Sequence, residues 1–320
     1  MSVIKQEPQS IVSGTRDATV PPIIVTKIRF GLANQMFQYA AGRRLAYMTH
    51  GHLVLLLDDD FAHHNQREFG LTAFNISASV VTQKNVAQRL RAIFPAHSAP
   101  LPESLIEEKR YGDYFPQSGT GILAGRRDLL FRPEVLSWRR SLTLLGLWQD
   151  ERYFSDIPDC IRHEFTLKAP PGARNAELMG RIAAAKSAFI HVRRGDYLAP
   201  SEINVLGVCS AGYYHYAAEV LRGRHGKDLK FFIFSDDPAW VRQEAIGGVG
   251  AEIIDWNSHT PAIDLMLMRA CQHAVISNST FSWWGAWLGE RPGNTIIAPR
   301  VWAKALPEFQ EIVPERWLRI

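Results

Sequence analysis

A regular alternation of short apolar runs with helical segments, in the second half of the chain, constrains the fold more than any other feature. The runs that predict strands are 187–192, 229–234, 252–254, 274–276 and 295–297. Helical patterns lie between them, at 211–221, from Pro238, at 262–270 and from about Phe281. Strands that alternate with helices form βαβ units around a parallel sheet, so this half predicts a Rossmann-like domain.

The first half of the chain opens with the same kind of pattern. Its predicted elements are a strand at 23–30, a turn at 31–34, a helix from Gln35 to about Met48, strands at 53–57 and 142–147, and a helix at 153–165. Most of residues 60–150 shows no clear period. The β-α-β start nevertheless predicts a second doubly wound sheet.

Lys168-Ala169-Pro170-Pro171-Gly172 is the best linker signal, because two prolines and a glycine can continue neither a helix nor a central strand. We therefore expect a flexible tail at 1–21, an α/β domain at 22–167 and a second at 168–320, whose last helix packs back on the first domain. A chain of 320 residues is long enough for two domains. Facing α/β domains bind ligands in the cleft at the carboxyl ends of their strands.

Charge and composition exclude several classes of protein. The net charge of +4 is spread without a basic run, so we expect no nucleic-acid partner. Apolar runs such as 53–57 fall far short of the ~20 residues that span a bilayer, and residues 1–20 lack a signal-peptide pattern. Cys160, Cys209 and Cys271 are odd in number and widely spaced, which favours a reducing cytoplasm over a disulfide framework.

His191-Val192-Arg193-Arg194-Gly195-Asp196-Tyr197 lies where an apolar strand ends and a loop begins. We expect Arg193 and Arg194 to point into the cleft, because guanidinium groups bind phosphate oxygens in a bidentate manner and keep their charge. The alternative is a surface ion pair between one arginine and Asp196.

A hydroxyl-rich turn, Ser277-Asn278-Ser279-Thr280, precedes an aromatic helix. Ser279 or Thr280 would cap this helix, whose N-terminus attracts phosphate through its free N–H groups. An ordinary cap is the alternative. The helix carries Trp283, Trp284 and Trp287, which we interpret as core residues rather than as a sugar-binding platform.

Two acidic motifs leave further alternatives open. In Ser235-Asp236-Asp237-Pro238 a carboxylate can accept hydrogen bonds from a ribose or a base, or Asp237 can cap the helix that starts at Pro238. Asp58-Asp59-Asp60 resembles a metal-binding signature for Mg²⁺ or Mn²⁺. Because Arg193 and Arg194 supply the same positive charge, we expect no metal. Four clustered histidines, His50, His52, His63 and His64, lack a cysteine partner and regular ligand spacing, so we interpret them as loop residues rather than as a zinc site.

Four motifs together resemble the α-1,2-fucosyltransferase family, glycosyltransferase family 11. In chain order they are 31–39 (GLANQMFQY), 191–197 (HVRRGDY), 235–237 (SDD) and 278–288 (NSTFSWWGAWL). The resemblance implies a two-domain GT-B fold and inverting transfer of L-fucose from GDP-β-L-fucose to O2 of a terminal galactose, without a metal or other cofactor. The acceptor would be an oligosaccharide or a lipid-linked glycan, and the protein would be cytoplasmic, at the inner face of a bacterial membrane.

The resemblance also implies roles for individual residues. The second domain would hold the diphosphate through Arg193, Arg194, Ser279 and Thr280, with Asn278 beside them and Asp236 near the guanosine. Gly31 and Asn34 would meet the donor from the first domain.

The base that accepts the proton of the acceptor hydroxyl is left open. Asp196 is the carboxylate closest in sequence to the arginine pair, and Glu202 follows in the next loop.

The first motif departs from the family at Ala33, where the family usually has a second glycine, so a positive φ there would be costly. Two other functions remain as alternatives. One is a related transferase with another nucleotide-sugar donor, and the other is a non-catalytic glycan- or nucleotide-binding protein.

Overall fold

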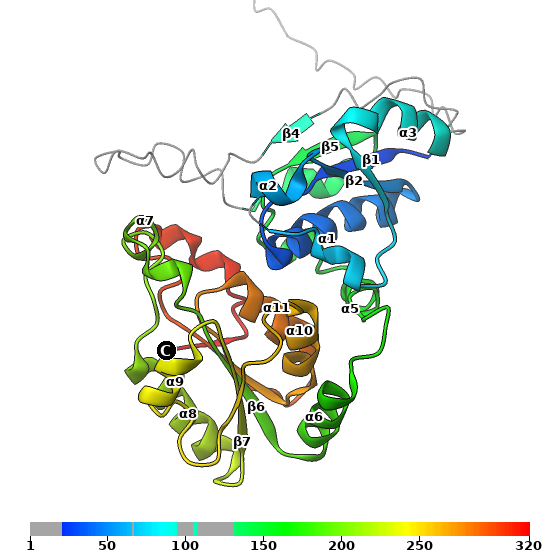
Figure 1. Ribbon diagram of the computed structural model, residues 1–320. Coiled ribbons are helices and arrows are strands. Elements are labelled where there is room, and N and C mark those ends of the chain that lie inside the picture. The colour runs from blue at the N-terminus through cyan, green and yellow to red at the C-terminus, as the bar shows by residue number, and fades with distance from the viewer. Residues whose placement is uncertain (1–20, 66, 95–104, 108–130) are drawn as a thin grey trace, which may run out of the picture.

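The computed structural model describes residues 21–65, 67–94, 105–107 and 131–320, which form two α/β domains stacked one above the other in Figure 1. The expected tail lies outside the described residues, apart from Pro21. Each domain contains a sheet whose neighbouring strands are all parallel. Two facing Rossmann-like domains, the GT-B architecture, are therefore confirmed.

The first sheet has the strand order β3-β2-β1-β5-β4. Its strands are β1 (Ile23–Lys27), β2 (His52–Leu57), β3 (Ser79–Thr82), β4 (Leu105–Glu107) and β5 (Leu142–Leu145). The helices of this domain are α1 (Leu32–Thr49), α2 (Phe61–Asn65), α3 (Val86–Ile93) and α5 (Pro158–Glu164), with 3-10 turns at Gly70–Ala73, Gln83–Asn85, Pro133–Ser137 and Glu151–Tyr153. All five residues of β1 are buried, as expected for a central strand covered on both faces.

The second sheet has the order β11-β10-β9-β6-β7-β8. Its strands are β6 (Ser187–Val192), β7 (Lys230–Ser235), β8 (Glu252–Ile254), β9 (His273–Val275), β10 (Ile296–Ala298) and β11 (Leu318–Arg319). The helices are α6 (Ala173–Ala184), α7 (Pro200–Ile203), α8 (Ala211–His225), α9 (Pro238–Gln243), α10 (Pro261–Ala270) and α11 (Thr280–Gly289), with 3-10 turns at Asp196–Leu198 and Pro307–Ile312. Numbered from β6, this is the 3-2-1-4-5-6 order of a dinucleotide-binding fold.

The end of the chain differs from the expected last helix. It is the short strand β11, which adds to the sheet beside β10, and the helical element before it is only the 3-10 turn Pro307–Ile312. This turn still reaches the first domain, because Glu311 pairs with Arg152 at 2.6 Å. Prolines at 307 and 314 bracket the segment and leave no room for a longer helix.

An aromatic seam joins the two domains. We define it as Phe37 of α1, Phe154 and Phe165 of the first domain, and Trp283, Trp284 and Trp287 of α11, all at most 2% exposed. The Phe37 ring lies 4.7 Å from Trp283 and 4.8 Å from Trp284, while Phe154 stacks on Trp284 at 5.4 Å. The seam makes one apolar core out of both domains, which confirms the three tryptophans as core residues.

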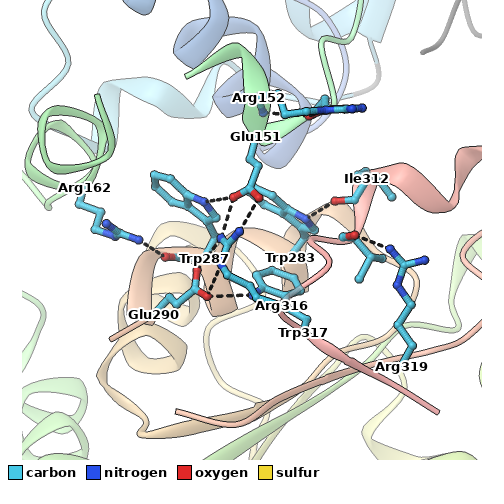
Figure 2. A network of polar contacts seen from close by, with 12 residues as sticks. Glu151, Arg152, Arg162, Trp283, Trp287, Glu290, Ile312, Arg316, Trp317 and Arg319 are labelled. Carbon is cyan, nitrogen blue, oxygen red and sulfur yellow. Dashed lines mark hydrogen bonds and ion pairs between the residues drawn. The ribbon is translucent and has the colours of Figure 1, made fainter. Parts of the chain in front are cut away.

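Polar contacts close the edge of this seam, as Figure 2 shows. The Trp287 indole donates to Glu151 at 3.0 Å, and the Trp283 indole donates to the Ile312 carbonyl at 2.8 Å. Arg316 bridges Glu151 of the first domain and Glu290 of the second. The buried indole N–H groups are therefore satisfied, as polar groups in a dry interface must be.

Candidate active site

A cleft of about 800 Å³ lies between the domains, at the carboxyl ends of both sheets. In the second sheet β6 and β9 are neighbours, so the strand order reverses there and the loops after the two strands diverge. In the first sheet the same reversal falls between β1 and β5. Doubly wound sheets bind ligands at such switch points, and here the two switch points face one cleft.

The predicted site residues divide into two groups. Those that line the cleft are Gly31, Asn34, Arg193, Asp196, Asp236, Ser279 and Thr280. Arg194 and Asn278 are not among the residues that line it. The loops after β1, β6, β7 and β9 thus bring together segments more than 240 residues apart in sequence, from Asn34 to Thr280.

Arg193 is held between two carboxylates at the end of β6. Its guanidinium lies 2.7 Å from Asp196 and 3.0 Å from Asp236. The side chain keeps 27% of its surface exposed. The ion pair with Asp196 that the sequence left as an alternative therefore exists, and the same guanidinium is accessible to an anion in the cleft.

Asp236 also fixes the backbone of the arginine loop. Its second oxygen accepts a hydrogen bond from the Arg194 N–H at 2.9 Å. A Cβ atom on Gly195 would come within 2.6 Å of the Asp236 carboxylate, so glycine is required for this close approach.

Arg194 and Asn278 support the loops from behind. The Arg194 guanidinium contacts Asp237 at 3.2 Å and lies 4.0 Å from the centre of the Trp240 ring. Asn278 is buried, and its amide donates to the carbonyls of Leu206 and Gly207. Successive side chains leaving a strand alternate in direction, which explains why Arg193 reaches the cleft and Arg194 does not.

Ser279 and Asp237 both cap helices, which was the alternative to ligand binding in the sequence analysis. Ser279 Oγ accepts a hydrogen bond from the Phe281 N–H at 3.3 Å and caps α11. Asp237 accepts from the Trp240 N–H at 3.1 Å and caps α9. The first N–H groups of a helix have no intrahelical partner, and each cap satisfies one of them. The N-terminus of α11 still lies in the cleft.

The N-termini of α1 and α11 approach each other across the cleft. The Trp284 indole donates to the Ala33 carbonyl at 3.0 Å, and Thr280 Oγ1 donates to Asn34 Oδ1 at 3.5 Å. Because each helix N-terminus carries a partial positive charge, the pair creates a local field suited to an anion.

The turn before α1 is strained at Phe30 rather than at the position of Ala33. Ala33 lies inside α1, and the positive φ of 65° belongs to Phe30, whose carbonyl accepts from the buried Gln35 amide at 2.8 Å. The alanine in the first motif therefore needs no left-handed backbone. Strained positions of this kind concentrate near functional sites.

Arg67, His191 and Asp264 are among the cleft residues that had no predicted role. Arg67 of the first domain lies 3.6 Å from Asp196, and its surroundings show no sequence period. His191 contacts Ser277 at 3.1 Å, and burial lowers the pKa of its imidazole to about 3, so it is neutral. Burial raises the pKa of the Asp264 carboxyl to about 6 despite a hydrogen bond from Asn257. His191 belongs to the motif at 191–197, whereas Arg67 and Asp264 lie outside the four motifs.

The acidic triplet has other partners. Asp58 pairs with Lys27, and Asp59 accepts from the Lys84 N–H at 2.7 Å. Among the described residues, no group of three His, Cys, Asp or Glu side chains is arranged to hold a metal ion. Glu202 is absent from the residues that line the cleft. Within the described ranges no helix has the length and apolar character required to cross a bilayer.

Comparison with solved structures supports the fold. The crystal structure of Se-Met fucosyltransferase NodZ from Bradyrhizobium matches with a TM-score of 0.50 and 16% sequence identity. The match covers 83% of this chain and 92% of that chain.

Comparison with known sequences supplies the family. The family model for glycosyl transferase family 11 matches residues 131–320. The galactoside alpha-(1,2)-fucosyltransferase 1 of Bos taurus is 31% identical over 48% of this chain and 45% of its own length. The alpha-1,2-colitosyltransferase of Escherichia coli is 30% identical over 93% of this chain and 99% of its own length. The chain belongs to glycosyl transferase family 11.

Proposed function

We propose that this glycosyltransferase moves L-fucose from GDP-β-L-fucose to O2 of a terminal galactose, with inversion at the anomeric carbon. One observation carries the proposal: the guanidinium of Arg193 and the N-termini of α1 and α11 converge on one cleft. A nucleoside diphosphate is the anion that this arrangement suits, since its charge grows as the sugar leaves.

The proposed reaction is a single displacement. The acceptor hydroxyl oxygen forms a bond to the anomeric carbon, while the bond from that carbon to the β-phosphate oxygen breaks and its electron pair leaves with GDP. Arg193 and the helix N-termini stabilise this charge more in the transition state than in the ground state. Asp196, which lines the cleft beside Arg193, accepts the hydroxyl proton. No step requires a metal.

A second donor has a specific observation in its favour. The relative that matches over nearly the whole chain is named a colitosyltransferase, and colitose is fucose without the 3-hydroxyl. A site that hydrogen-bonds that hydroxyl would reject GDP-colitose strongly, whereas an apolar pocket would accept both donors. We give priority to fucose, because the relative from Bos taurus and the structural neighbour are both named fucosyltransferases.

A donor and acceptor panel tests the proposal. GDP-fucose, GDP-colitose and UDP-galactose are each incubated with lactose, lacto-N-biose, N-acetyllactosamine and a lipid-linked oligosaccharide, and product linkage is determined by NMR. We expect an α-1,2 product from GDP-fucose. Transfer from GDP-colitose alone favours the second donor. GDP binding without turnover on any acceptor would instead indicate a non-catalytic binding protein.

A further inference from the structure

Gln149 contacts Asn34 at the switch point of the first sheet. Asn34 lies in the first turn of α1, which follows β1, and Gln149 lies in the loop after the neighbouring strand β5. The Gln149 Nε2 donates to Asn34 Oδ1 at 2.6 Å. Thr280 Oγ1 of the second domain donates to the same oxygen at 3.5 Å. Asn34 Oδ1 therefore accepts hydrogen bonds from two donors, one from each domain.

The backbone around Gln149 is fixed by its neighbours. Trp148 is fully buried and has a φ of 55°, which is rare for a bulky side chain. The Asp150 N–H donates back to the Trp148 carbonyl at 2.9 Å, and the buried Gln38 amide donates to the Gly146 carbonyl at 2.9 Å. Such a conformation is unfavourable for a side chain of this size and persists where surrounding structure enforces it. The loop therefore fixes the backbone position from which Gln149 reaches Asn34.

The contact decides which way the Asn34 amide points. An asparagine oxygen accepts hydrogen bonds and its nitrogen donates them, and in this structure Oδ1 is the Asn34 atom that faces Gln149 Nε2 and Thr280 Oγ1. The Asn34 side chain lines the cleft, and within the described chain its Nδ2 has no protein partner. The nitrogen is thus available to donate to a ligand, in a residue that lines the cleft near the N-terminus of α11.

We propose that Gln149 is a positioning residue that orients the Asn34 amide so that its N–H groups donate to the leaving diphosphate. This proposal rests on the proposed function, in which the cleft binds the diphosphate. Gln149 itself need not touch the substrate.

Two substitutions at one position test the orientation. Gln149→Met keeps the approximate volume and removes the donor, so Asn34 Oδ1 loses the hydrogen bond that orients the Asn34 amide. Gln149→Glu replaces the donor with an acceptor, which binds Asn34 Nδ2 and turns Asn34 Oδ1 toward the diphosphate. We expect kcat with GDP-fucose to fall roughly 10-fold for Met, the scale of one lost hydrogen bond, and about 100-fold for Glu, the scale of an inverted transition-state contact.

The same two substitutions in an Asn34→Ala background provide the control. Without the amide there is nothing to orient, so we expect the two double variants to agree with Asn34→Ala within about threefold. This background also measures the effect of the added negative charge at 149. GDP affinity from calorimetry and melting temperature are measured for all six proteins, because a merely structural role lowers the melting temperature equally in both backgrounds.

The outcomes separate the two proposals. Equal effects of Met and Glu, or effects that persist without Asn34, overturn the role of Gln149 while leaving the proposed function intact. If Asn34→Ala leaves GDP affinity and turnover unchanged, Asn34 does not contribute to activity, and the proposed role of Gln149 in orienting it is overturned. If wild-type protein does not bind GDP, the proposed function and this inference fall together.

Discussion

The seam and the cleft meet at one helix, α11, and are built from opposite kinds of side chain. The body of α11 contributes Trp283, Trp284 and Trp287 to the seam, where each side chain is almost fully buried. Its N-terminus contributes Ser279 and Thr280 to the cleft, beside the partly exposed Arg193.

The seam sets the geometry of the site, and the cleft supplies its charged and polar groups. The dry seam fixes α11 against α1 through the contacts of Trp284 with Phe37 and the Ala33 carbonyl. That packing sets the distance between the two helix N-termini. The polar contacts of the cleft therefore do not have to position the two helices. The partly exposed Arg193 and the helix N-termini can therefore stabilise the charge of a ligand without reorganisation.

The largest effect should come from breaking the seam. Trp284→Ala removes a fully buried ring and leaves the Ala33 carbonyl without its donor. We expect a loss of about 3–5 kcal/mol in the free energy of unfolding, measured with urea. Tyr216→Ala, at a position 58% exposed, is the control and should change this value little. A loss below about 1 kcal/mol for Trp284→Ala would show that the domains do not depend on the seam.

Changes in the cleft should lower activity without lowering stability. Arg193→Ala should reduce kcat by roughly 10²- to 10³-fold, the usual effect of removing one preorganised donor. Arg193→Lys should restore little, because lysine keeps the charge and loses the planar fork. The kinetics are read together with the melting temperature. Turnover within about threefold of wild type in a folded Arg193→Ala protein would show that Arg193 only forms a surface ion pair and does not bind the diphosphate.

A smaller, pH-dependent effect is expected at Asp264 in the cleft wall. Burial raises the pKa of this carboxyl to about 6 in the folded protein, above its ordinary value near 4. The stability associated with the protonated carboxyl is therefore complete below pH 4 and is lost as the pH rises through 6. Asp264→Asn should melt higher than wild type at pH 7.5, with the difference vanishing near pH 4. A difference independent of pH would contradict the shift.

Chelation should have the smallest effect of all. We expect EDTA to leave initial rates unchanged, since Arg193 and the helix N-termini take the place of a metal in the proposed mechanism. Loss of activity on chelation and its return with Mn²⁺ would move the diphosphate site toward Asp58 and Asp59.

The sequence predicted the second domain better than the first for a physical reason. Strands buried on both faces, such as β6 and β7, are continuous apolar runs, and the alternation with helices marks each crossover. Part of the first domain consists of short 3-10 turns and brief strands such as β3, which carry no extended period. The strand β11 was not predicted, because two residues are too few to form a pattern.

Sequence motifs placed most of the cleft residues but not their orientation. The motif around Arg193 and Arg194 contained two equivalent arginines, and only the end of β6 decides that one faces the cleft while the other stacks on Trp240. Arg67 enters the cleft from the other domain. Its place depends on the packing of two domains, which no local pattern in the sequence encodes.

The most direct test of the proposed diphosphate site compares GDP with guanosine in a calorimetric titration, in the presence of EDTA. In the proposed site Arg193 and two helix N-termini bind a diphosphate without a metal. We therefore expect wild-type protein to bind GDP at least about 100-fold more tightly than guanosine, and Arg193→Ala to lose most of this difference. Equal affinity for the two ligands, or a preference for GDP that is unchanged in Arg193→Ala, would contradict it.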